Sequence, residues 1–288
     1  MKFRVDRDRL AESVAWAARS LPVRPSVPVL AGLLIEADSD GLQLSGFDYE
    51  TSARASLAAE VADEGRALVS GRLLADICRS LPAHQVEMSL ERQRVTLVCG
   101  SSRFTLQTMP VEDYPSLPAL PDVSGTVPAD NFTGAVSQAV AAAGRDDMLP
   151  LLTGVRVEIS GEQIIMMATD RFRASLVELT WSPARPDAEG VALVPARVLA
   201  DTARAVAAGT DLDVALAPLG SGDGLIGFQG AVDDGSRRTT TRLLDGEFPA
   251  CSNCSPASRR PRPGSRPHRS SRRCAGSRWS PSATPRYG

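Results

Sequence analysis

The sequence contains few residues of the kinds that build most catalytic and metal centres. Its 288 residues include two histidines, five cysteines and one lysine, Lys2, so the other 31 basic residues are arginine. His84 is the only histidine in residues 1–250, which argues against a histidine-based triad or a multi-histidine metal site there. P-loop, GxGxxG and HExxH motifs are also lacking. We therefore expect no catalytic residue, no metal and no cofactor.

Long apolar runs are lacking too. No stretch reaches the length of about 18 apolar residues that a transmembrane helix needs, and the opening MKFRVDRDRL has no apolar core of the signal-peptide kind. A composition of 43% hydrophobic and 23% charged residues is typical of folded proteins. We expect a cytoplasmic protein with no membrane contact and about two domains.

The small net charge of −2 hides an uneven distribution. Residues 251–288 contain nine arginines and no acidic residue, so residues 1–250 carry the other 23 basic and all 34 acidic residues, a net charge of −11. The segment 251–288 also lacks Leu, Ile, Val, Met and Phe. Such a segment buries too little apolar surface to offset its ordering entropy, so we expect a disordered tail.

An internal repeat is the most informative feature of residues 1–250. ALVSGRLLADICR (67–79) matches ALVPARVLADTAR (192–204) at eight of thirteen positions. Upstream, PVLAGLLIE (28–36) matches PLLTGVRVE (150–158), and at the same spacing Asp48 aligns with Asp170. The chain therefore consists of two copies of one unit.

Each copy is expected to be α+β, with two helices packed on antiparallel sheet. Apolar residues at helical spacing predict a first helix around Leu10 and Val14 and its equivalent around Phe132 and Val136. Second helices are expected at 71–81 and 196–207. Alternating apolar residues between turn residues predict strands at 33–37, 42–46, 86–90, 95–99, 103–109, 155–159, 164–169, 212–217 and 225–229.

The second helix of each copy repeats a pattern of charge. Arg72, Asp76 and Arg79 share one face, and Arg197, Asp201 and Arg204 repeat the arrangement. One interpretation is an ordinary solvated helix face with Arg–Asp pairs worth about 0.3–0.5 kcal/mol each. The other is that both copies present arginines to the phosphates of one extended polyanion, without sequence specificity. The repetition favours the second interpretation modestly.

The cysteines support a structural interpretation better than a chemical one. Cys78 lies on the apolar side of a predicted helix and Cys99 ends a predicted strand, so both are expected in the core. In the tail, Cys251, Cys254, His268 and Cys274 are spaced loosely like a zinc knuckle. The residues between them are mostly Arg, Ser and Pro, which cannot pack around a metal, so zinc is disfavoured.

Several segments together resemble one family, the bacterial sliding clamp, which is the beta subunit of DNA polymerase III. They are MKFRVDRDRLAESVAWAARSLPVRPSVPVLAGLLIEA, SGFDYETSARASL, MPVEDYPSLP, LPLLTGVRVEI, MMATDRFRAS and TTTRLLDGEFP. The resemblance implies the DNA-clamp fold, with three similar domains per chain and two chains closing head to tail into a ring around duplex DNA. The chain would be a non-catalytic processivity factor of DNA replication, although the polymerase complex has nucleotidyltransferase and exonuclease activities.

The resemblance also implies roles for individual residues. Arg24 matches a DNA-contacting arginine of the family, Arg145 occupies nearly the equivalent loop, and the four helix arginines would lie on or near the lining of the ring. The implied partners, the polymerase III catalytic subunit, the clamp loader and repair proteins, insert short apolar peptides into a pocket. One wall of that pocket maps to Leu152, Thr169, Arg171, Arg173 and Ala174, with Arg171-Phe172 standing where Gly-His is common.

The resemblance assigns residues 1–120 to a first clamp domain and 128–250 to a second, and it ends there. Residues 251–288 do not match the family's linker and third domain, and we hypothesise a frameshift before them. A chain without the third domain is expected neither to close the usual homodimer ring nor to complete the peptide pocket. The alternative function is a stand-alone nucleic-acid-binding module that uses the arginine-rich tail.

Overall fold

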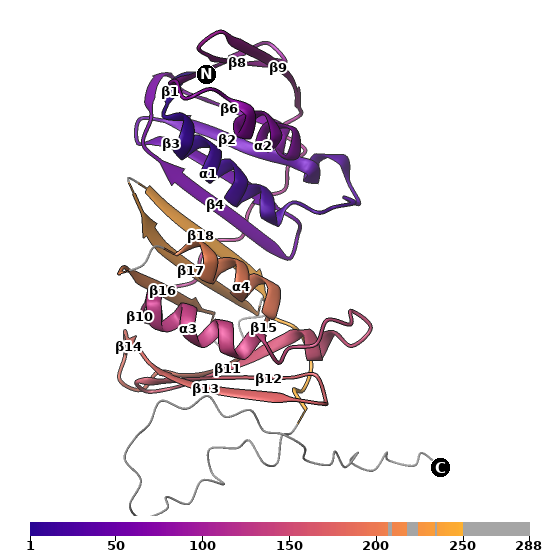
Figure 1. The fold of residues 1–288 in the computed structure, drawn as a ribbon, viewed down its shortest axis with the longest axis vertical. Coiled ribbons are helices and arrows are strands. Elements are labelled where there is room, and N and C mark those ends of the chain that lie inside the picture. Colours follow the sequence, from indigo (N-terminus) through magenta and orange to yellow (C-terminus); the bar gives the residue numbers. More distant parts are fainter. Residues whose placement is uncertain (207–208, 218–223, 234, 250–288) are drawn as a thin grey trace, which may run out of the picture.

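The computed structural model describes residues 1–206, 209–217, 224–233 and 235–249. They form two units that follow one another along the long axis of the molecule (Figure 1). The first unit comprises β1 to β9 with helices α1 and α2, and the second comprises β10 to β18 with helices α3 and α4. The expected tail, 251–288, lies outside the described residues.

The first unit opens with a strand and a helix and ends on a run of three strands. Its elements are β1 Lys2–Val5, α1 Arg7–Ala17, η1 Ala18–Ser20, η2 Pro28–Ala31, β2 Gly32–Asp38, β3 Gly41–Phe47, β4 Thr51–Leu57, β5 Glu60–Asp63, β6 Gly65–Ser70, α2 Gly71–Ser80, β7 Val86–Glu91, β8 Arg94–Cys99 and β9 Ser102–Met109.

The second unit repeats this order with one short 3-10 helix fewer. Its elements are β10 Gly125–Pro128, α3 Ala129–Val140, η3 Pro150–Thr153, β11 Gly154–Ser160, β12 Gln163–Thr169, β13 Ala174–Thr180, β14 Ser182–Pro183, β15 Glu189–Pro195, α4 Ala196–Ala205, β16 Asp211–Leu216, β17 Leu225–Val232 and β18 Gly235–Arg242.

The two units also share their strand register. In the first unit Leu34 of β2 pairs with Ser45 of β3, and in the second Arg156 of β11 pairs with Met167 of β12, in each case 122 residues later. The same spacing relates the pairings of β3 with β4 and of β12 with β13. The duplication inferred from the sequence is therefore a duplication of topology, and the expected α+β clamp architecture is confirmed.

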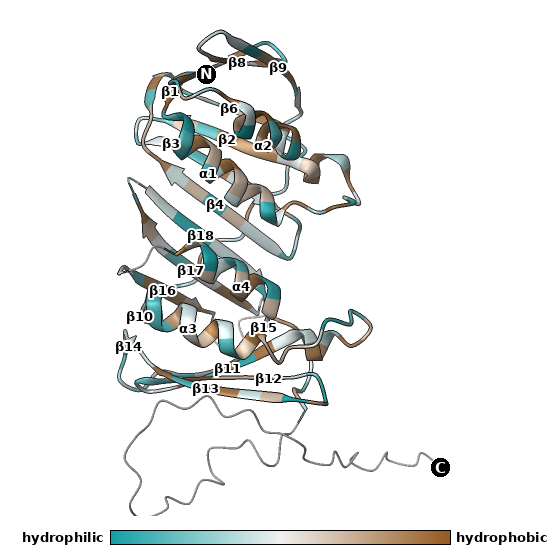
Figure 2. Ribbon diagram, viewed as in Figure 1, coloured by the Kyte–Doolittle hydropathy of each residue, from teal (hydrophilic) through white to brown (hydrophobic). Residues whose placement is uncertain are grey.

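Strands β18 and β4 join the units into one sheet of fourteen strands, in the order β14-β10-β16-β17-β18-β4-β3-β2-β6-β9-β8-β7-β1-β5. The two strands run antiparallel through seven residue pairs, from Gly235 opposite Leu57 to Thr241 opposite Thr51. Both are pale to teal in Figure 2, because Ser, Thr and Arg dominate them. A separate four-stranded sheet, β13-β12-β11-β15, belongs to the second unit.

Each unit has a core of its own between its helices and its strands. Phe3, Leu10, Leu33 and Leu74 are among the fully buried residues of the first core, and Phe132 belongs to the second. Helix α1 begins at Arg7 because the carboxylate of its N-cap residue, Asp6, accepts the backbone N–H groups of residues 8 and 9 at 3.0 Å. Two independent cores allow each unit to fold around its own helices.

All nine strands expected from alternating apolar residues are present, and the second helices begin at the expected residues, Gly71 and Ala196. Nine further strands were not expected: β1, β4, β5, β6, β10, β13, β14, β15 and β18. Among these, β4, β13 and β18 lack a regular apolar alternation. Cys78 and Cys99 are buried, as expected, and burial raises the pKa of the Cys78 thiol to about 12.

In the described part of the chain no helix is both long and apolar enough to cross a membrane.

Candidate functional site

Helices α2 and α4 expose equivalent arginines. Leu74, Ile77 and Cys78 of α2 are buried, which leaves Arg72 and Arg79 at the surface. Arg197 and Arg204 are exposed in the same way on α4. The apolar residues of each helix recur at helical spacing, so burying that stripe turns both arginines outward. The arginine pattern that occurs twice in the sequence therefore forms two equivalent exposed surfaces, one on α2 and one on α4.

Carboxylates on the same helices partly neutralise these arginines. Arg79 forms an ion pair with Asp76, while Arg204 lies 2.7 Å from Asp201 and Arg197 lies 3.8 Å from it. With two arginines and one aspartate, each helix carries a net charge of +1. Exposed pairs of this kind are weak and are screened by salt, so the guanidinium groups can exchange a carboxylate for a phosphate at little cost.

The loops that carry Arg24 and Arg145 project to the same side of the molecule, on the right in Figure 1. Both arginines are exposed. Arg72 on α2 donates a hydrogen bond to the carbonyl oxygen of Pro22 at 3.2 Å, which ties the first loop to the helix. In the first unit, the loop that carries Arg24 therefore lies next to the helix that carries Arg72.

The second candidate surface is a turn and a 3-10 helix that lie against each other in the second unit. Extending the pairing of Arg156 with Met167 places Thr169, the last residue of β12, opposite Gly154. Leu152 lies two residues before that glycine and is buried, whereas Arg171 and Arg173 are exposed and Ala174 is half-buried. All five residues expected in the pocket wall therefore belong to one end of the sheet β13-β12-β11-β15.

Hydrogen bonds hold the turn 169–173 in one conformation. The hydroxyl of Thr169 donates to the carbonyl oxygen of Arg173 at 2.8 Å, and the carboxylate of Asp170 accepts the backbone N–H groups of Phe172 and Arg173 at 3.1 and 2.9 Å. Arg171 has a φ of 76°. Partial burial raises the pKa of Asp170, but the backbone and side-chain hydrogen bonds from Arg173 and the one from Phe172 outweigh it, so the pKa lies below its ordinary value.

The ring of Phe172 is 90% exposed at the tip of this turn. Met148, in the loop before η3, is 86% exposed. Large apolar side chains that are almost fully exposed are uncommon on a soluble surface unless a partner covers them, although scattered single ones occur. The turn thus combines a rigid backbone with an apolar group that makes little contact with its own unit.

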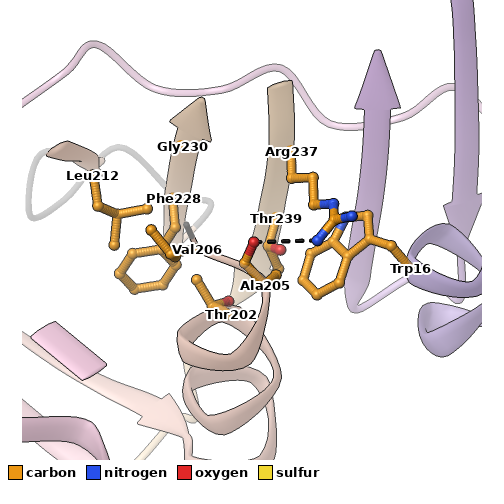
Figure 3. Close-up of a pocket in the computed structure, with 9 residues that line it drawn as sticks. All are labelled: Trp16, Thr202, Ala205, Val206, Leu212, Phe228, Gly230, Arg237 and Thr239. Carbon is orange, nitrogen blue, oxygen red and sulfur yellow. Dashed lines mark hydrogen bonds between the residues drawn. The ribbon is translucent and has the colours of Figure 1, made fainter. Parts of the chain in front are cut away.

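Among the described residues, cavities lie where the units meet. The larger, of about 220 Å³, is lined by residues of both units, among them Trp16, Arg19, Asp48, Arg197 and Asp201. The smaller, of about 10 Å³, is enclosed by Trp16, Thr202, Ala205, Val206, Leu212, Phe228, Gly230, Arg237 and Thr239 (Figure 3).

Arg237 of β18 connects the two units at the smaller cavity. Its guanidinium donates to the carbonyl oxygen of Ala205 at 3.2 Å, drawn as a dashed line in Figure 3, and lies 3.3 Å from the carboxylate of Glu12. The same group lies 5.9 Å from the centre of the Trp16 ring, at the reach of a cation–π contact. No pattern in the sequence indicated this junction, because its residues come from three distant segments, α1, α4 and β18.

Comparison with known proteins explains the repeated unit. The model of the N-terminal domain of the DNA polymerase III beta subunit matches residues 1–118, and the model of its central domain matches residues 126–250. The chain belongs to the beta sliding clamp family. It is 58% identical over 249 residues to the beta sliding clamp of Streptomyces coelicolor and 49% identical over 258 residues to that of Micrococcus luteus.

The chain spans 65% of the length of the Streptomyces coelicolor clamp and 81% of the Micrococcus luteus sequence, with 86% and 90% of its own residues. Among solved structures, the sliding clamp of Bacillus subtilis superposes with a TM-score of 0.79 at 23% identity, covering 89% of this chain and 68% of that one. A clamp from Pseudomonas aeruginosa bound to griselimycin gives a TM-score of 0.78 at 24% identity, covering 89% and 68%. These likenesses establish the clamp fold.

Proposed function

We propose that the chain acts as a sliding clamp, a non-catalytic processivity factor that holds the replicative DNA polymerase on duplex DNA. One observation carries the proposal: two homologous units, joined by a continuous sheet, expose the same pair of arginines on equivalent helices. Membership of the clamp family supports this function. The units would correspond to residues 1–120 and 128–250 of a cytoplasmic protein.

The charge of the helices suits a clamp that slides. A net charge of +1 on α2 and on α4 attracts phosphates, while the carboxylates of Asp76 and Asp201 compete for the same guanidinium groups. Contacts to the backbone of DNA carry no sequence information, so none of them favours one position on the duplex. Weak and repeated contacts of this kind hold DNA without stopping its movement.

Direct DNA binding tests this part of the proposal. We expect replacement of Arg72, Arg79, Arg197 and Arg204 by alanine to lower the affinity for a fluorescent duplex at least tenfold at low salt. The slope of log affinity against log salt should become shallower by about 0.9 for each phosphate contact that is lost. Fluorescence anisotropy over a salt series measures both effects.

A control variant with the same change in charge makes this result specific. Arg66 and Arg94 lie on strands, and Arg92 and Arg185 lie in turns between strands, so replacing these four removes the same charge away from the helices. We expect them to retain most of the affinity. Equal losses in the two variants would show that only net charge matters and would refute the helix site, whereas loss on deletion of residues 251–288 alone would favour the alternative nucleic-acid-binding module.

We further propose that the turn 169–173 and Leu152 form one wall of a site for short apolar peptides of partner proteins, among them the polymerase catalytic subunit, the clamp loader and repair proteins. The exposed ring of Phe172 and the ordered backbone around Asp170 support this proposal. A rigid turn loses little conformational entropy when a peptide packs against it.

Peptide binding tests the second site. We expect Phe172→Ala to weaken binding of a labelled short apolar peptide at least fivefold, which corresponds to about 1 kcal/mol. Val191 of β15 is the matched control, because it belongs to the same unit and is also exposed. An equal loss for Val191→Ala, measured by anisotropy, would show that the peptide does not recognise the turn.

A further inference from the structure

Two arginines stand opposite each other where the two units join. Arg54 of β4 and Arg238 of β18 are partners in the antiparallel ladder that connects the units. In the same ladder Arg242 donates its backbone N–H to the carbonyl oxygen of Glu50. Because hydrogen-bonded pairs recur at every second residue, the two arginines also form such a pair, with Cα atoms about 5.5 Å apart. Their side chains therefore leave the sheet side by side on the same face.

This face of the sheet is the one that the helices do not cover. Arg237 precedes Arg238 in β18 and points toward the helices, because its guanidinium contacts the other side of the junction there. The contacts are with Ala205 of α4 and Glu12 of α1. Successive side chains of a strand point to opposite faces, so Arg238 and Arg54 point away from both helices. The pair is therefore separated by the sheet from the arginines of α2 and α4.

Neutral groups surround the two guanidinium groups on their face of the sheet. Gln229 of β17 stands opposite Arg238 and accepts a hydrogen bond from its Nε at 2.8 Å. Ser45 of β3 stands opposite Arg54. The next positions along the ladder carry hydroxyl groups, from Ser52, Ser56, Ser236 and Thr240. Among the residues that the structure describes, neither arginine forms an ion pair with a carboxylate.

This arrangement is unfavourable for an unliganded junction. Like charges directly opposite each other in a sheet are destabilising. Both residues are half-buried, and burial, followed by the charge of Arg54, lowers the pKa of the Arg238 guanidinium. Arg54 makes no hydrogen bond within the described residues, yet its nitrogens are not among the buried unpaired atoms, so a small ion can reach them. A bound anion would turn the repulsion into attraction.

The charge and the shape of the pair favour phosphate over a carboxylate. A guanidinium group is a planar fork that binds the oxygens of a carboxylate or a phosphate two at a time. A carboxylate has two oxygens and one charge, so it satisfies one fork. A phosphate group has at least three terminal oxygens and about 1.5 to 2 negative charges at pH 7, so it can satisfy two forks at once.

We propose that Arg54 and Arg238 together bind a phosphate group, either free inorganic phosphate or the phosphate of a small monoester. One arginine comes from each unit, so the bound phosphate bridges the units on the face opposite the helices. A ligand that binds only the folded junction stabilises it by mass action. The site does not depend on DNA or peptide binding, so failure of those functions leaves this proposal intact.

Calorimetric titration of the full chain with inorganic phosphate tests the site, with chloride keeping the ionic strength constant. We expect Arg54→Gln and Arg238→Gln each to lower the affinity at least tenfold, because each removes the hydrogen bonds of one charged group. Arg103→Gln is the matched control. Arg103 is an exposed arginine on β9 with Val98 opposite it, so its loss removes the same charge and should change the affinity less than twofold.

Thermal unfolding distinguishes a phosphate site from a pair with a merely structural role. Without phosphate, Arg54→Gln should leave the melting temperature unchanged or raise it, because the substitution removes a repulsion. In saturating phosphate the unaltered chain should melt at the higher temperature, because only this chain gains the free energy of binding. Phosphate also stabilises folded proteins by exclusion from their surface, but this effect is common to both chains and cancels in the comparison.

A second titration, with phenyl phosphate, distinguishes the two sources of the phosphate group. Tighter binding of the ester assigns the site to a phosphorylated small molecule, and tighter binding of inorganic phosphate assigns it to the free ion.

Three outcomes would overturn the proposal. The first is that the unaltered chain binds neither form of phosphate. The second is an equal loss of affinity in Arg54→Gln and Arg103→Gln, because that would show an effect of net charge alone. The third is binding of acetate as tightly as phosphate, because a site built from two forks should prefer the group with more oxygens and more charge.

Discussion

The turn 48–51 of the first unit and the turn 170–173 of the second have the same backbone but different surroundings. Asp48 and Asp170 each accept two backbone N–H groups, and the residues that follow them, Tyr49 and Arg171, have φ values of 74° and 76°. Thr51 then pairs with Thr241 of the other unit and is half-buried, whereas Arg173, at the equivalent position, is exposed. A local sequence thus builds the turn, and the neighbouring unit decides whether it becomes a junction or a surface.

The strands that follow these turns differ in chemistry as well as in exposure. In β4 the small polar residue Ser52 is buried, and opposite it Thr239 to Thr241 of β18 are buried too. Ser56 and Ser236 share a hydrogen bond of 2.8 Å across the junction. The hydroxyl groups of Thr239 and Thr240, in contrast, are buried without a hydrogen-bond partner among the described residues, so hydrogen bonding satisfies only part of this polar junction. Strand β13 is more apolar, and its Leu176 and Val177 are half-buried.

The largest expected effect is the loss of stability caused by emptying the core of one unit. Phe132→Ala should lower the free energy of unfolding of the second unit by about 3–5 kcal/mol, because it empties a fully buried position. Leu10→Ala, at the equivalent position of the first unit, should cost about 2–5 kcal/mol. Hydrogen exchange should show that each substitution accelerates exchange mainly in its own unit. Equal acceleration in both would mean that the units unfold as one.

A proline at equivalent positions compares the covered edge with the open one. Arg54→Pro removes an N–H that faces β18 and should cost clearly more stability than the equivalent change in β13, because β4 is paired on both sides. Leu176→Pro removes the equivalent N–H from the open edge of β13 and should cost the isolated chain less than about 1 kcal/mol. Chemical denaturation measures both, and similar costs would contradict the assignment of β13 as an open edge.

Substitutions of Arg237 and of its partner Glu12 test how much side chains contribute to the junction between the units. Arg237→Ala should destabilise the junction by about 1–3 kcal/mol, because the side chain is 18% exposed and its loss leaves the carbonyl oxygen of Ala205 without that donor. Glu12→Ala should cost less than about 1 kcal/mol, because the carboxylate is 73% exposed. Thermal unfolding of the two variants should rank them in this order.

The smallest expected effect concerns acid stability at the open turn. The pKa of Asp170 is lower in the folded chain than its ordinary value, so this carboxylate stabilises the fold above its unfolded pKa and loses that contribution as the pH falls through its folded pKa. Asp170→Asn should therefore flatten the decline of the melting temperature between about pH 5 and pH 3. The unaltered chain is the reference, and identical slopes for it and for Asp170→Asn would contradict the prediction.

The elements that the sequence predicted best are those whose own apolar pattern requires them. Helix α2 was expected to begin at Gly71 and to end near Leu81, and it ends at Ser80, because Leu74, Ile77 and Cys78 define one buried stripe. Strands β4 and β18 carried no such signal. Threonine and serine in them are buried by the opposite unit, and no local pattern encodes a partner 180 residues away in the chain.

The candidate site also contains residues that a local pattern predicted and residues that only the tertiary structure brought together. The repeated arginines were predictable because the helix period places them opposite the buried stripe. The proposed pocket wall rests on family resemblance, since Leu152 and Thr169 belong to separate segments that only the register of β11 and β12 brings together. The cavities beside Trp16 were not predicted, because residues of both units line them.

The amino-acid sequence by itself determined that the chain contains one unit twice, because periodicity and repeated motifs are local properties that a single chain displays. Only the tertiary structure decided which edges of the two units meet and which lack a partner among the described strands. Strand pairing is set by backbone groups that every residue possesses, so the choice between β4 and β13 as the partner of β18 depends on chain connection and on side-chain contacts across the junction.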